Sequence, residues 1–249
     1  MDYNMLRASV LGSNALPKDA EKYFDQIQLF RDMMMRYQCA MLEVQTKLQV
    51  LNNDMAVRYQ RNPIEAIKTR IKDPISIVEK MKRRGLNITV GNMVRNLNDV
   101  AGIRVICSFI DDIYEVARML ARQDDIKVLT VKDYIKNPKD NGYRSYHMIV
   151  EIPVFFSDKT MNMRVEVQIR TIAMDFWASL EHDLKYKKND IWSEDISSEL
   201  LSCAEVINDT DNRMMAIRDR IYEFRRNSEK YDEKEKTAKE TGGTPPSEQ

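Results

Sequence analysis

The chain lacks a net charge, a long apolar run and a paired set of cysteines. Its 39 Lys and Arg residues balance 39 Asp and Glu residues, which argues against duplex nucleic acid as a partner, because such proteins usually carry a basic excess. No run approaches the length of a membrane span, and the N-terminus lacks the basic-then-apolar order of a signal peptide. Cys39, Cys107 and Cys203 are far apart and match no metal spacing. We therefore expect a cytoplasmic protein with free thiols and no membrane partner.

Both ends of the chain carry helical patterns. Apolar residues at alternating spacings of three and four form one stripe near each end. The stripes are Ile27, Phe30, Met34, Tyr37, Met41, Val44, Leu48, Leu51 and Met55, then Ile196, Leu200, Cys203, Ile207, Thr210, Met214, Ile217, Ile221 and Phe224. Two long helices could bury these stripes against each other, against the middle of the chain or against a second subunit.

The middle of the chain changes to strand-like segments. β-branched residues are frequent in four segments of strand length. These are residues 103–109, 127–134, 146–153 and 163–169, with helical patterns at 111–122 and 171–187. The connections favour an α+β fold in which helices flank a mixed, largely antiparallel sheet.

We divide the chain into an N-terminal helical region (1–60), a core (61–190), a C-terminal helix (191–228) and a tail (229–249). The tail is charged and then rich in glycine and proline. It has almost nothing to bury, so we expect it to be disordered.

Residues 138–147 combine a glycine-marked turn with cations and aromatic rings. Gly142 permits a tight turn. Lys139 and Arg144 can meet phosphates, and Tyr143 offers a flat apolar face to a base. An Asn-Gly pair between apolar runs also fits a plain hairpin turn, but a two-residue loop does not need so many charged and aromatic neighbours. The segment therefore indicates a nucleotide site.

Two carboxylates stand on or beside the predicted strands. Alternation in residues 163–170 places Glu166 on one polar face with Gln168 and Arg170, although such a face is often only solvated. Asp99 stands where the chain enters the first predicted strand. Two carboxylates from different strands are suited to Mg²⁺ beside a triphosphate, because that ion leaves positions for phosphate oxygens and water.

A short helix supplies cations. An Asp-Pro pair at positions 73 and 74 gives an N-cap and a proline at the first helical position. The polar face then carries Ser76, Lys80 and Arg83, and Arg70 and Lys72 lie upstream. Such a face is often only a solvated surface. Together with the loop and the carboxylates, it predicts a polyphosphate cradle.

Five sequence blocks together carry a family resemblance. They run from Arg70 to Arg83, Asp99 to Arg104, Tyr134 to His147, Glu166 to Thr171 and Phe176 to His182. In this order they resemble the synthetase domain of RelA/SpoT-type alarmone enzymes, and the short length resembles the small alarmone synthetases. The resemblance implies a nucleotidyltransferase-like sheet and transfer of the β,γ-pyrophosphate of ATP to the 3′-hydroxyl of GDP or GTP. The products would be AMP and ppGpp or pppGpp, in the stringent response of a bacterial cytoplasm, and the enzyme would be a homotetramer.

The resemblance also implies a role for each site residue. The ATP-binding set is Arg70, Lys72, Ser76, Lys80, Arg83 and Arg104, of which Arg70 and Arg104 would hold the adenine between their guanidinium planes. The GDP- or GTP-binding set is Lys139, Tyr143, Arg144, His147, Gln168 and Arg170, with Tyr143 stacked on guanine. Asp99 and Glu166 would be the catalytic and metal-binding pair for Mg²⁺, and Glu166 would accept the proton of the attacking hydroxyl. Positioning and charge neutralisation dominate such transfers.

Two positions depart from the pattern of product-activated members of the family. Those members carry an aromatic residue and an asparagine where Ala66 and Asp175 stand here. An acid at Asp175 would repel a phosphorylated effector, so we expect no activation by the alarmone.

Two other functions compete with synthesis. Alarmone hydrolysis would use a His-Asp pair such as His182-Asp183, but His147 and His182 are too few histidines for the usual metal cluster. A non-catalytic nucleotide- or RNA-binding module on the same fold would be expected to lack a metal carboxylate, whereas Asp99 and Glu166 are both present.

Overall fold

The computed structural model describes residues 20–59, 61–187 and 194–241. Within these residues, five strands form one sheet in the order β1-β2-β5-β4-β3. They are β1 (Ile64–Ile71), β2 (Ala101–Cys107), β3 (Lys127–Asp133), β4 (Tyr146–Phe155) and β5 (Thr160–Thr171). Strand β5 is parallel to β2, and the other neighbouring pairs of this sheet are antiparallel. The predicted α+β fold with a mixed, largely antiparallel sheet is confirmed.

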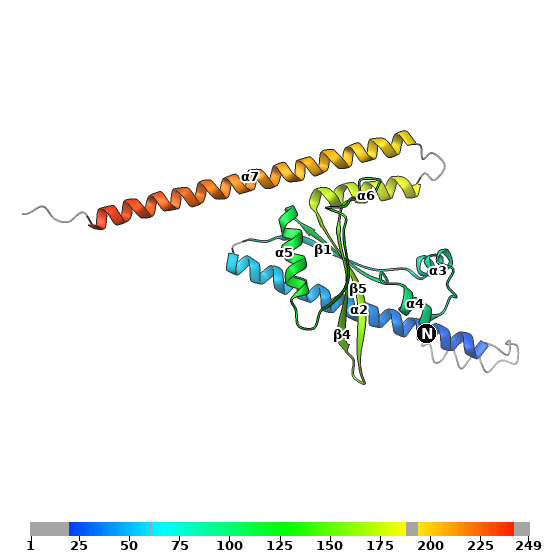
Figure 1. Ribbon diagram of the computed structural model, residues 1–249. Coiled ribbons are helices and arrows are strands. Elements are labelled where there is room, and N and C mark those ends of the chain that lie inside the picture. The colour runs from blue at the N-terminus through cyan, green and yellow to red at the C-terminus, as the bar shows by residue number, and fades with distance from the viewer. Residues whose placement is uncertain (1–19, 60, 188–193, 242–249) are drawn as a thin grey trace, which may run out of the picture.

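Four of the strands match the predicted segments, and β4 and β5 form a hairpin that projects from the body (Figure 1). Strand β1 was not predicted. It is an edge strand, most of its residues are partly or fully exposed, and its apolar alternation is weak. Its pairing with β2 is long-range and is not visible in the local sequence.

One face of the sheet is covered by α2 (Ala20–Tyr59) and α5 (Ile110–Ala121). The predicted N-terminal stripe lies on α2, where Tyr37, Val44 and Leu48 are at most 2% exposed. They pack in one core with the odd-numbered residues of β5, Val165, Val167 and Ile169. This stripe is therefore buried mainly within the chain itself.

The short helices α3 (Pro74–Arg83) and α4 (Val90–Asn96) connect β1 to β2. The predicted start of α3 is confirmed, because the Asp73 side chain accepts a hydrogen bond of 2.9 Å from the Ser76 backbone N–H. Helix α4 has seven residues and was not predicted.

Helices α6 (Ile172–Lys187) and α7 (Glu194–Thr241) pack on each other at one end of the sheet (Figure 1). Trp177, Ala178 and Ala204 form a small second core there. The Arg218 guanidinium, 2.7 Å from Asp111 and 4.5 Å from the Phe109 ring centre, fixes α7 to the start of α5.

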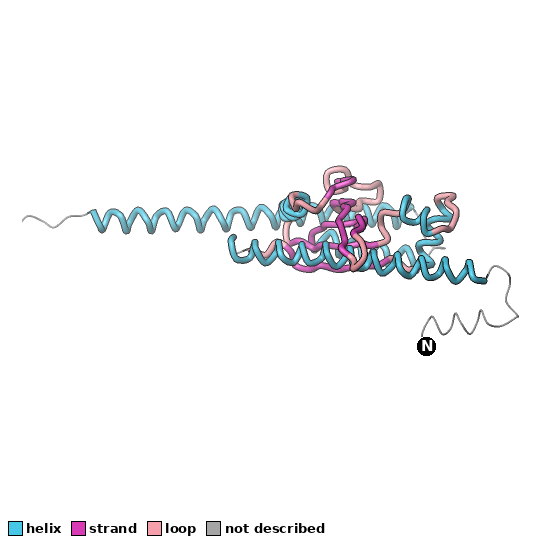
Figure 2. Tube along the Cα trace, turned by 90° about the horizontal axis from the view of Figure 1, so that it is seen from below, coloured by secondary structure: helices cyan, strands magenta, loops and turns pink. Residues whose placement is uncertain are grey.

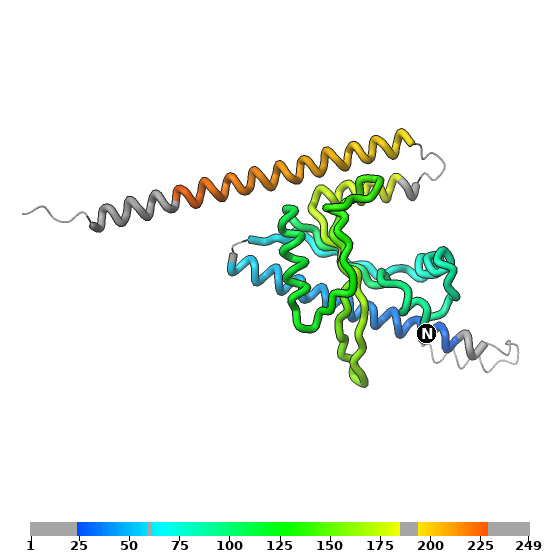
Figure 3. The backbone as a smooth tube through the Cα atoms, in the orientation of Figure 1, coloured from blue at the N-terminus to red at the C-terminus, as the bar shows by residue number. Residues whose placement is uncertain are grey.

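Beyond this contact α7 leaves the body (Figure 3). Figure 2 shows the strands gathered at the middle of the molecule, with a long helix extending past them. The helix continues through Thr241, whereas the sequence predicts its end at 228 and a disordered tail. Lys and Glu are frequent in residues 229–241 and favour a helix, which accounts for the difference. Residues 242–249 lie outside the described residues.

None of the helices among the described residues combines the length and the apolar character that a membrane span needs.

Candidate active site

The uncovered face of the sheet carries two rows of side chains that run across all five strands. Strand register aligns Lys68, Arg104, Gln168, His147 and Lys132 in one row. The adjacent row contains Arg70, Gly102, Glu166, Ile149 and Thr130. Successive residues of a strand point to opposite faces, so members of each row share the face opposite α2. Cations thus stand on both sides of the single carboxylate in these rows, that of Glu166.

Two cavities open on this face. The first cavity, of about 380 Å³, is lined by Lys68, Thr69, Arg70, Lys72, Asp99, Gly102, Ile103, Arg104, Glu166 and Gln168. The second cavity, of about 420 Å³, is lined by Lys80, Arg84, Asn98, Asp99, Thr130, Lys132, Tyr134, Lys139, His147, Ile149 and Glu166. Asp99 and Glu166 line both cavities. The two predicted catalytic acids therefore stand where the cavities meet.

Asp99 is held by two lysines. Its Oδ2 accepts hydrogen bonds from Lys72 at 3.0 Å and from Lys80 at 2.5 Å. Burial alone would raise the pKa of Asp99, but the hydrogen bonds from Lys80 and Lys72 outweigh burial and hold the pKa below its usual value. Its Oδ1 is buried and has no hydrogen-bond partner among the described residues. A buried carboxylate oxygen without a partner is costly, and a cation would satisfy it.

The residues present fit a magnesium site in which the substrate phosphates and water would supply the remaining ligands. No group of three or more His, Cys, Asp or Glu side chains in the described part of the chain could hold a metal by itself. Mg²⁺ in nucleotide sites commonly takes one or two carboxylates, together with phosphate oxygens and water. Asp99 Oδ1 and the Glu166 carboxylate suit that mode of binding.

Glu166 ends a chain of side chains that starts at Arg170. The Arg170 Nη2 donates to the Tyr143 hydroxyl oxygen at 2.5 Å, and this hydroxyl lies 2.8 Å from His147 Nε2. Arginine can only donate, so the tyrosine proton is directed to Nε2 and the histidine proton resides on Nδ1. That nitrogen lies 3.7 Å from Glu166 Oε1, and Gln168 donates to Oε2 at 2.9 Å.

Burial sets the protonation of His147, and hydrogen-bond partners set that of Glu166. It lowers the pKa of His147 below its usual value, against the opposing effect of Glu166. The imidazole is therefore neutral near pH 7, as the hydrogen bond from Tyr143 requires. Burial would raise the pKa of Glu166, but its interactions with His147 and Gln168 lower it. Glu166 is thus an ionised carboxylate, able to bind a cation or accept a proton.

The Gly142 loop, residues 134–145 between β3 and β4, borders the second cavity. Gly142 has a φ of +86°, and a Cβ there would lie 2.6 Å from the Ala204 Cβ of α7. The predicted tight turn is confirmed, and glycine is required on both counts. The Lys139 ammonium lies 4.9 Å from the Tyr134 ring centre and 4.7 Å from that of Tyr143.

The predicted ATP-binding residues divide between the two cavities. Arg70, Lys72 and Arg104 line the first cavity, and Lys80 lines the second. Ser76 and Arg83, also on α3, line neither cavity, and Arg83 is exposed.

The predicted acceptor residues also divide. Lys139 and His147 line the second cavity and Gln168 lines the first, while Tyr143 and Arg170 stand behind His147 in its hydrogen-bonded chain. Arg144 donates to the backbone carbonyls of Gly142 and Ala204, at 3.1 and 3.4 Å. Its guanidinium therefore braces the Gly142 loop against α7.

Sequence reasoning missed Lys68, Arg84 and Lys132, which also line the cavities. Lys132 alternates with Thr130 on β3, and this period of two could have indicated a shared face. Lys68 lies on the strand that was not predicted. Arg84 follows the predicted polar face of α3.

Asp175 has surroundings other than those the sequence interpretation assumed. Its carboxylate is 3.0 Å from Lys68, 3.1 Å from Arg104 and 3.4 Å from Arg170. These three cations outweigh the charge of Asp175. Repulsion of a phosphorylated effector by Asp175 is therefore not a valid reason to expect no activation by the alarmone. Ala66 lies on β1 opposite Ile106. The absence of product activation remains a prediction that rests on the two sequence departures.

An acidic pair between two cation-lined cavities on a mixed sheet defines a nucleotide-binding enzyme of the phosphoryl-transfer class. Residues 69–191 match the model of the region found in RelA / SpoT proteins. The chain is 41% identical over 192 residues to the GTP pyrophosphokinase YwaC of Bacillus subtilis, covering 77% of this chain and 91% of that protein. The chain belongs to the RelA/SpoT family and to its small alarmone synthetases.

Two solved structures agree with this assignment. Small alarmone synthetase 1 of Bacillus subtilis bound to its product pppGpp superposes with a TM-score of 0.73 at 33% identity, covering 78% of this chain and 99% of that one. Small alarmone synthetase 2 of the same organism gives a TM-score of 0.70 at 39% identity, covering 77% and 98%. The fold and the family therefore agree with the resemblance found in the sequence.

Proposed function

We propose that this chain is a GTP pyrophosphokinase that transfers the β,γ-pyrophosphate of ATP to the ribose 3′-oxygen of GDP or GTP. The products are AMP and ppGpp or pppGpp, the alarmones of the stringent response. The observation that carries the proposal is the position of Asp99 and Glu166, which line both cavities. Two nucleotides that react with each other need adjoining sites, and the transferred group must pass close to the acids between them.

The first cavity suits ATP. Arg70 and Arg104 line it on adjacent strands, and two planar guanidinium groups can hold a base between them. Lys72 and Lys80, which already meet at Asp99, are placed to neutralise phosphate charge. The second cavity suits the guanine nucleotide. Lys132, Lys139 and Arg84 supply its cations. The stacking of Tyr143 on guanine rests on the resemblance to the family, and Tyr143 lies in the loop that borders this cavity.

The chemistry assigned to the protein is orientation, charge neutralisation and proton acceptance. Glu166 is ionised and can take the proton of the 3′-hydroxyl as that oxygen attacks the β-phosphorus. His147 and Gln168 hold the carboxylate in place. Asp99 and Glu166 would hold Mg²⁺, which when bound supplies positive charge to the phosphate oxygens. No covalent enzyme intermediate is required.

The direct test is turnover. The purified protein is incubated with Mg²⁺, labelled ATP and either GDP or GTP, and the nucleotides are separated. We expect AMP together with a guanosine tetra- or pentaphosphate, at a rate that depends on Mg²⁺. Formation of ADP and inorganic phosphate alone would contradict the proposal and indicate a generic NTPase. The ratio of the two acceptor rates would give the preference between GDP and GTP.

The geometry gives less support to alarmone hydrolysis. His182 and Asp183 are exposed on α6 and line neither of the two cavities. A non-catalytic binding module would not need the acid pair. Synthesis from cytoplasmic nucleotides is therefore the function, and the cytoplasm the place of action, that we propose.

We also propose that the chain forms a homo-oligomer, a tetramer by resemblance to its family. The α2 stripe is buried in the chain's own core, so it does not supply the interface. Two other stripes remain exposed, Ile172, Phe176, Leu180 and Leu184 on α6, and Met214, Ile217, Ile221 and Phe224 on α7. Exposed apolar side chains grouped in this way commonly mark a protein–protein interface, and closed symmetry would cover them.

A further inference from the structure

Asp175, in the first turn of α6, gathers cations from three strands. Lys68 comes from β1, Arg104 from β2 and Arg170 from β5. One carboxylate oxygen, Oδ1, faces both arginines, and Oδ2 faces Lys68. The position also places a negative charge at the N-terminal turn of a helix, where the helix dipole favours it.

The three contacts differ in exposure. The Lys68 side chain is 57% exposed and that of Arg104 is 36% exposed, whereas those of Arg170 and Asp175 are 4% and 8% exposed. An ion pair with an exposed lysine contributes little, because water and salt screen it. A pair buried on both sides is different, since removal of one partner leaves an uncompensated charge out of water. The Arg170–Asp175 pair is therefore the contact that fixes Asp175.

The two arginines serve different parts of the site. Arg104 lines the first cavity. Arg170 donates to the Tyr143 hydroxyl and to Gln168 Oε1, and Tyr143 in turn contacts His147 of the second cavity. The Asp175 carboxylate thus connects a cation of the first cavity with the hydrogen-bonded chain that borders the second.

We propose that Asp175 is a positioning residue of the pyrophosphate transfer, which orients Arg104 toward ATP and Arg170 toward Tyr143. This role rests on the proposed function of the two cavities. Asp175 lines neither cavity. It acts by holding two guanidinium groups at fixed angles, so its loss should weaken the binding of both substrates.

The test compares Asp175→Asn with the wild type and with Asp211→Asn. Asp211 is a matched control, since it is also a buried acid but lines neither cavity; it accepts a hydrogen bond from Thr171 at 2.6 Å. In Asp175→Asn we expect KM for ATP and for the guanine nucleotide to rise about ten- to a hundred-fold, as for small misplacements of positioning groups. Asp211→Asn should leave both KM values near those of the wild type. Unchanged KM values in a folded Asp175→Asn protein would overturn the assignment.

A double-mutant cycle separates positioning from general packing. If Asp175 acts on ATP through Arg104, then Arg104→Ala should raise KM for ATP much less in the Asp175→Asn background than in the wild type. Effects that multiply independently would contradict the role. If thermal melting shows that Asp175→Asn does not fold, Asp175→Glu replaces it in the same cycle, because it retains the charge but displaces the carboxylate. The same two results then support or overturn the assignment.

Binding without turnover distinguishes this inference from the proposed function. Calorimetry with a non-hydrolysable ATP analogue measures whether Asp175→Asn weakens the first cavity. Weaker binding by the variant than by the wild type supports the positioning role whether or not AMP and an alarmone are formed. Equal binding by the two proteins overturns it, even where the wild type proves to be an active synthetase.

Discussion

Asp99 and Glu166 concentrate the chemistry of the molecule at single residues. One carboxylate oxygen of Asp99 accepts hydrogen bonds from Lys72 and Lys80. The other oxygen is buried and has no hydrogen-bond partner among the described residues. Glu166 is surrounded by cationic and polar side chains of the two cross-strand rows. Both acids have a pKa below the usual value. They therefore stay ionised at neutral pH, which a metal-binding pair requires.

Glu166→Gln and Asp99→Asn should each abolish turnover while the fold is retained. Each change removes a charge that the metal requires, and Glu166→Gln also removes the proton acceptor. Product formation is measured beside a circular dichroism spectrum. Glu151→Gln is the matched control, because Glu151 lies on β4 and lines neither cavity; it should retain activity. Activity above about a tenth of wild type in either acid variant would count against a metal role.

His147 gives a prediction for the pH dependence of stability. Burial places its folded-state pKa below the ordinary value of 6.5. Between these two values the unfolded chain binds more protons than the folded protein, so the free energy of unfolding rises with pH. The contribution is complete above the ordinary pKa and is lost as pH falls through the folded-state value.

The free energy of unfolding is measured in denaturant from about pH 8 to about pH 5 for the wild type and for His147→Gln. Only the wild type carries the His147 proton equilibrium, so the difference between the proteins isolates it from Asp112, whose pKa burial raises to about 6. The stability of the wild type relative to the variant should decrease toward acid. A difference that stays constant over this range would contradict the lowered pKa.

The sequence identified many of the site residues but did not always predict where their side chains point. Because Glu166 and Gln168 are two residues apart on one strand, the alternation placed them correctly on one face. Arg144 has the composition of a phosphate ligand, yet its guanidinium turns toward α7, because the carbonyl of Ala204 lies within reach. Ala204 is 60 residues away in the sequence, and only the folded chain reveals that acceptor.

At the scale of elements, register assembles the site. The two rows of side chains on the uncovered face form because the register of the strands aligns residues across β1, β2, β5, β4 and β3. Local sequence predicted four of these strands but neither their order nor their register. The parallel β2–β5 pair brings Gly102 beside Glu166, although these residues are far apart in the chain. The row is therefore a property of the sheet and not of any one segment.

The Gly142 loop packs closely against α7 at Gly142 and Ala204. Gly142→Ala should destabilise the protein and raise KM for the guanine nucleotide more than KM for ATP. The new Cβ meets Ala204 at 2.6 Å, so the loop or the helix must move, and Tyr143 moves with the loop. Thermal melting and substrate kinetics measure the two effects.

Gly85→Ala is the matched control. Gly85 also has a positive φ, +66°, but no atom lies within 4 Å of the added Cβ. It should therefore lose only the cost of a left-handed residue, about 1–2 kcal/mol. Equal losses of stability in the two variants would mean that the contact between Gly142 and α7 adds nothing.

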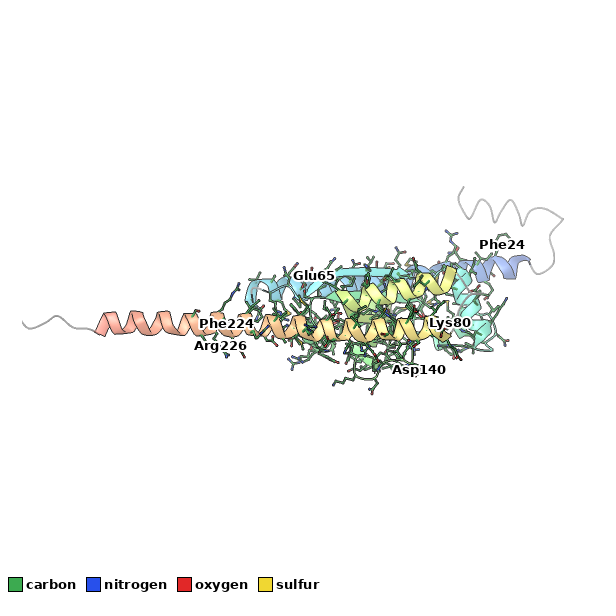
Figure 4. The ribbon with its side chains drawn as sticks, turned by 90° about the horizontal axis from the view of Figure 1, so that it is seen from above. Phe24, Glu65, Lys80, Asp140, Phe224 and Arg226 are labelled. Atoms are coloured by element: carbon green, nitrogen blue, oxygen red, sulfur yellow. The ribbon has the colours of Figure 1, made fainter. Side chains whose placement is uncertain are left out.

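At the scale of the whole molecule, α7 determines the shape. In the view of Figure 4, Phe224 and Arg226 mark the part of this helix that projects past the body, and Lys80 lies toward the other end. The sequence predicted two similar apolar stripes, but they differ in burial in the structure. The α2 stripe packs on the chain's own sheet, whereas α7 contacts the start of α5 through Arg218 and keeps Met214, Ile217, Ile221 and Phe224 exposed.

This difference predicts which changes dissociate the protein and which unfold it. Ile217 and Ile221 are 42% and 47% exposed on α7. Replacing both with lysine should therefore lower the mass measured by light scattering and leave the melting temperature of the subunit nearly unchanged.

Leu48 is 0% exposed, and Leu48→Lys should unfold the chain because it buries an unpaired charge. Val50 and Val57, 60% and 83% exposed on α2, supply the control pair. Lysine at both should alter neither mass nor melting. A wild-type protein that is already a monomer at micromolar concentration would contradict the interface, and the exposed residues of α7 would then need another partner.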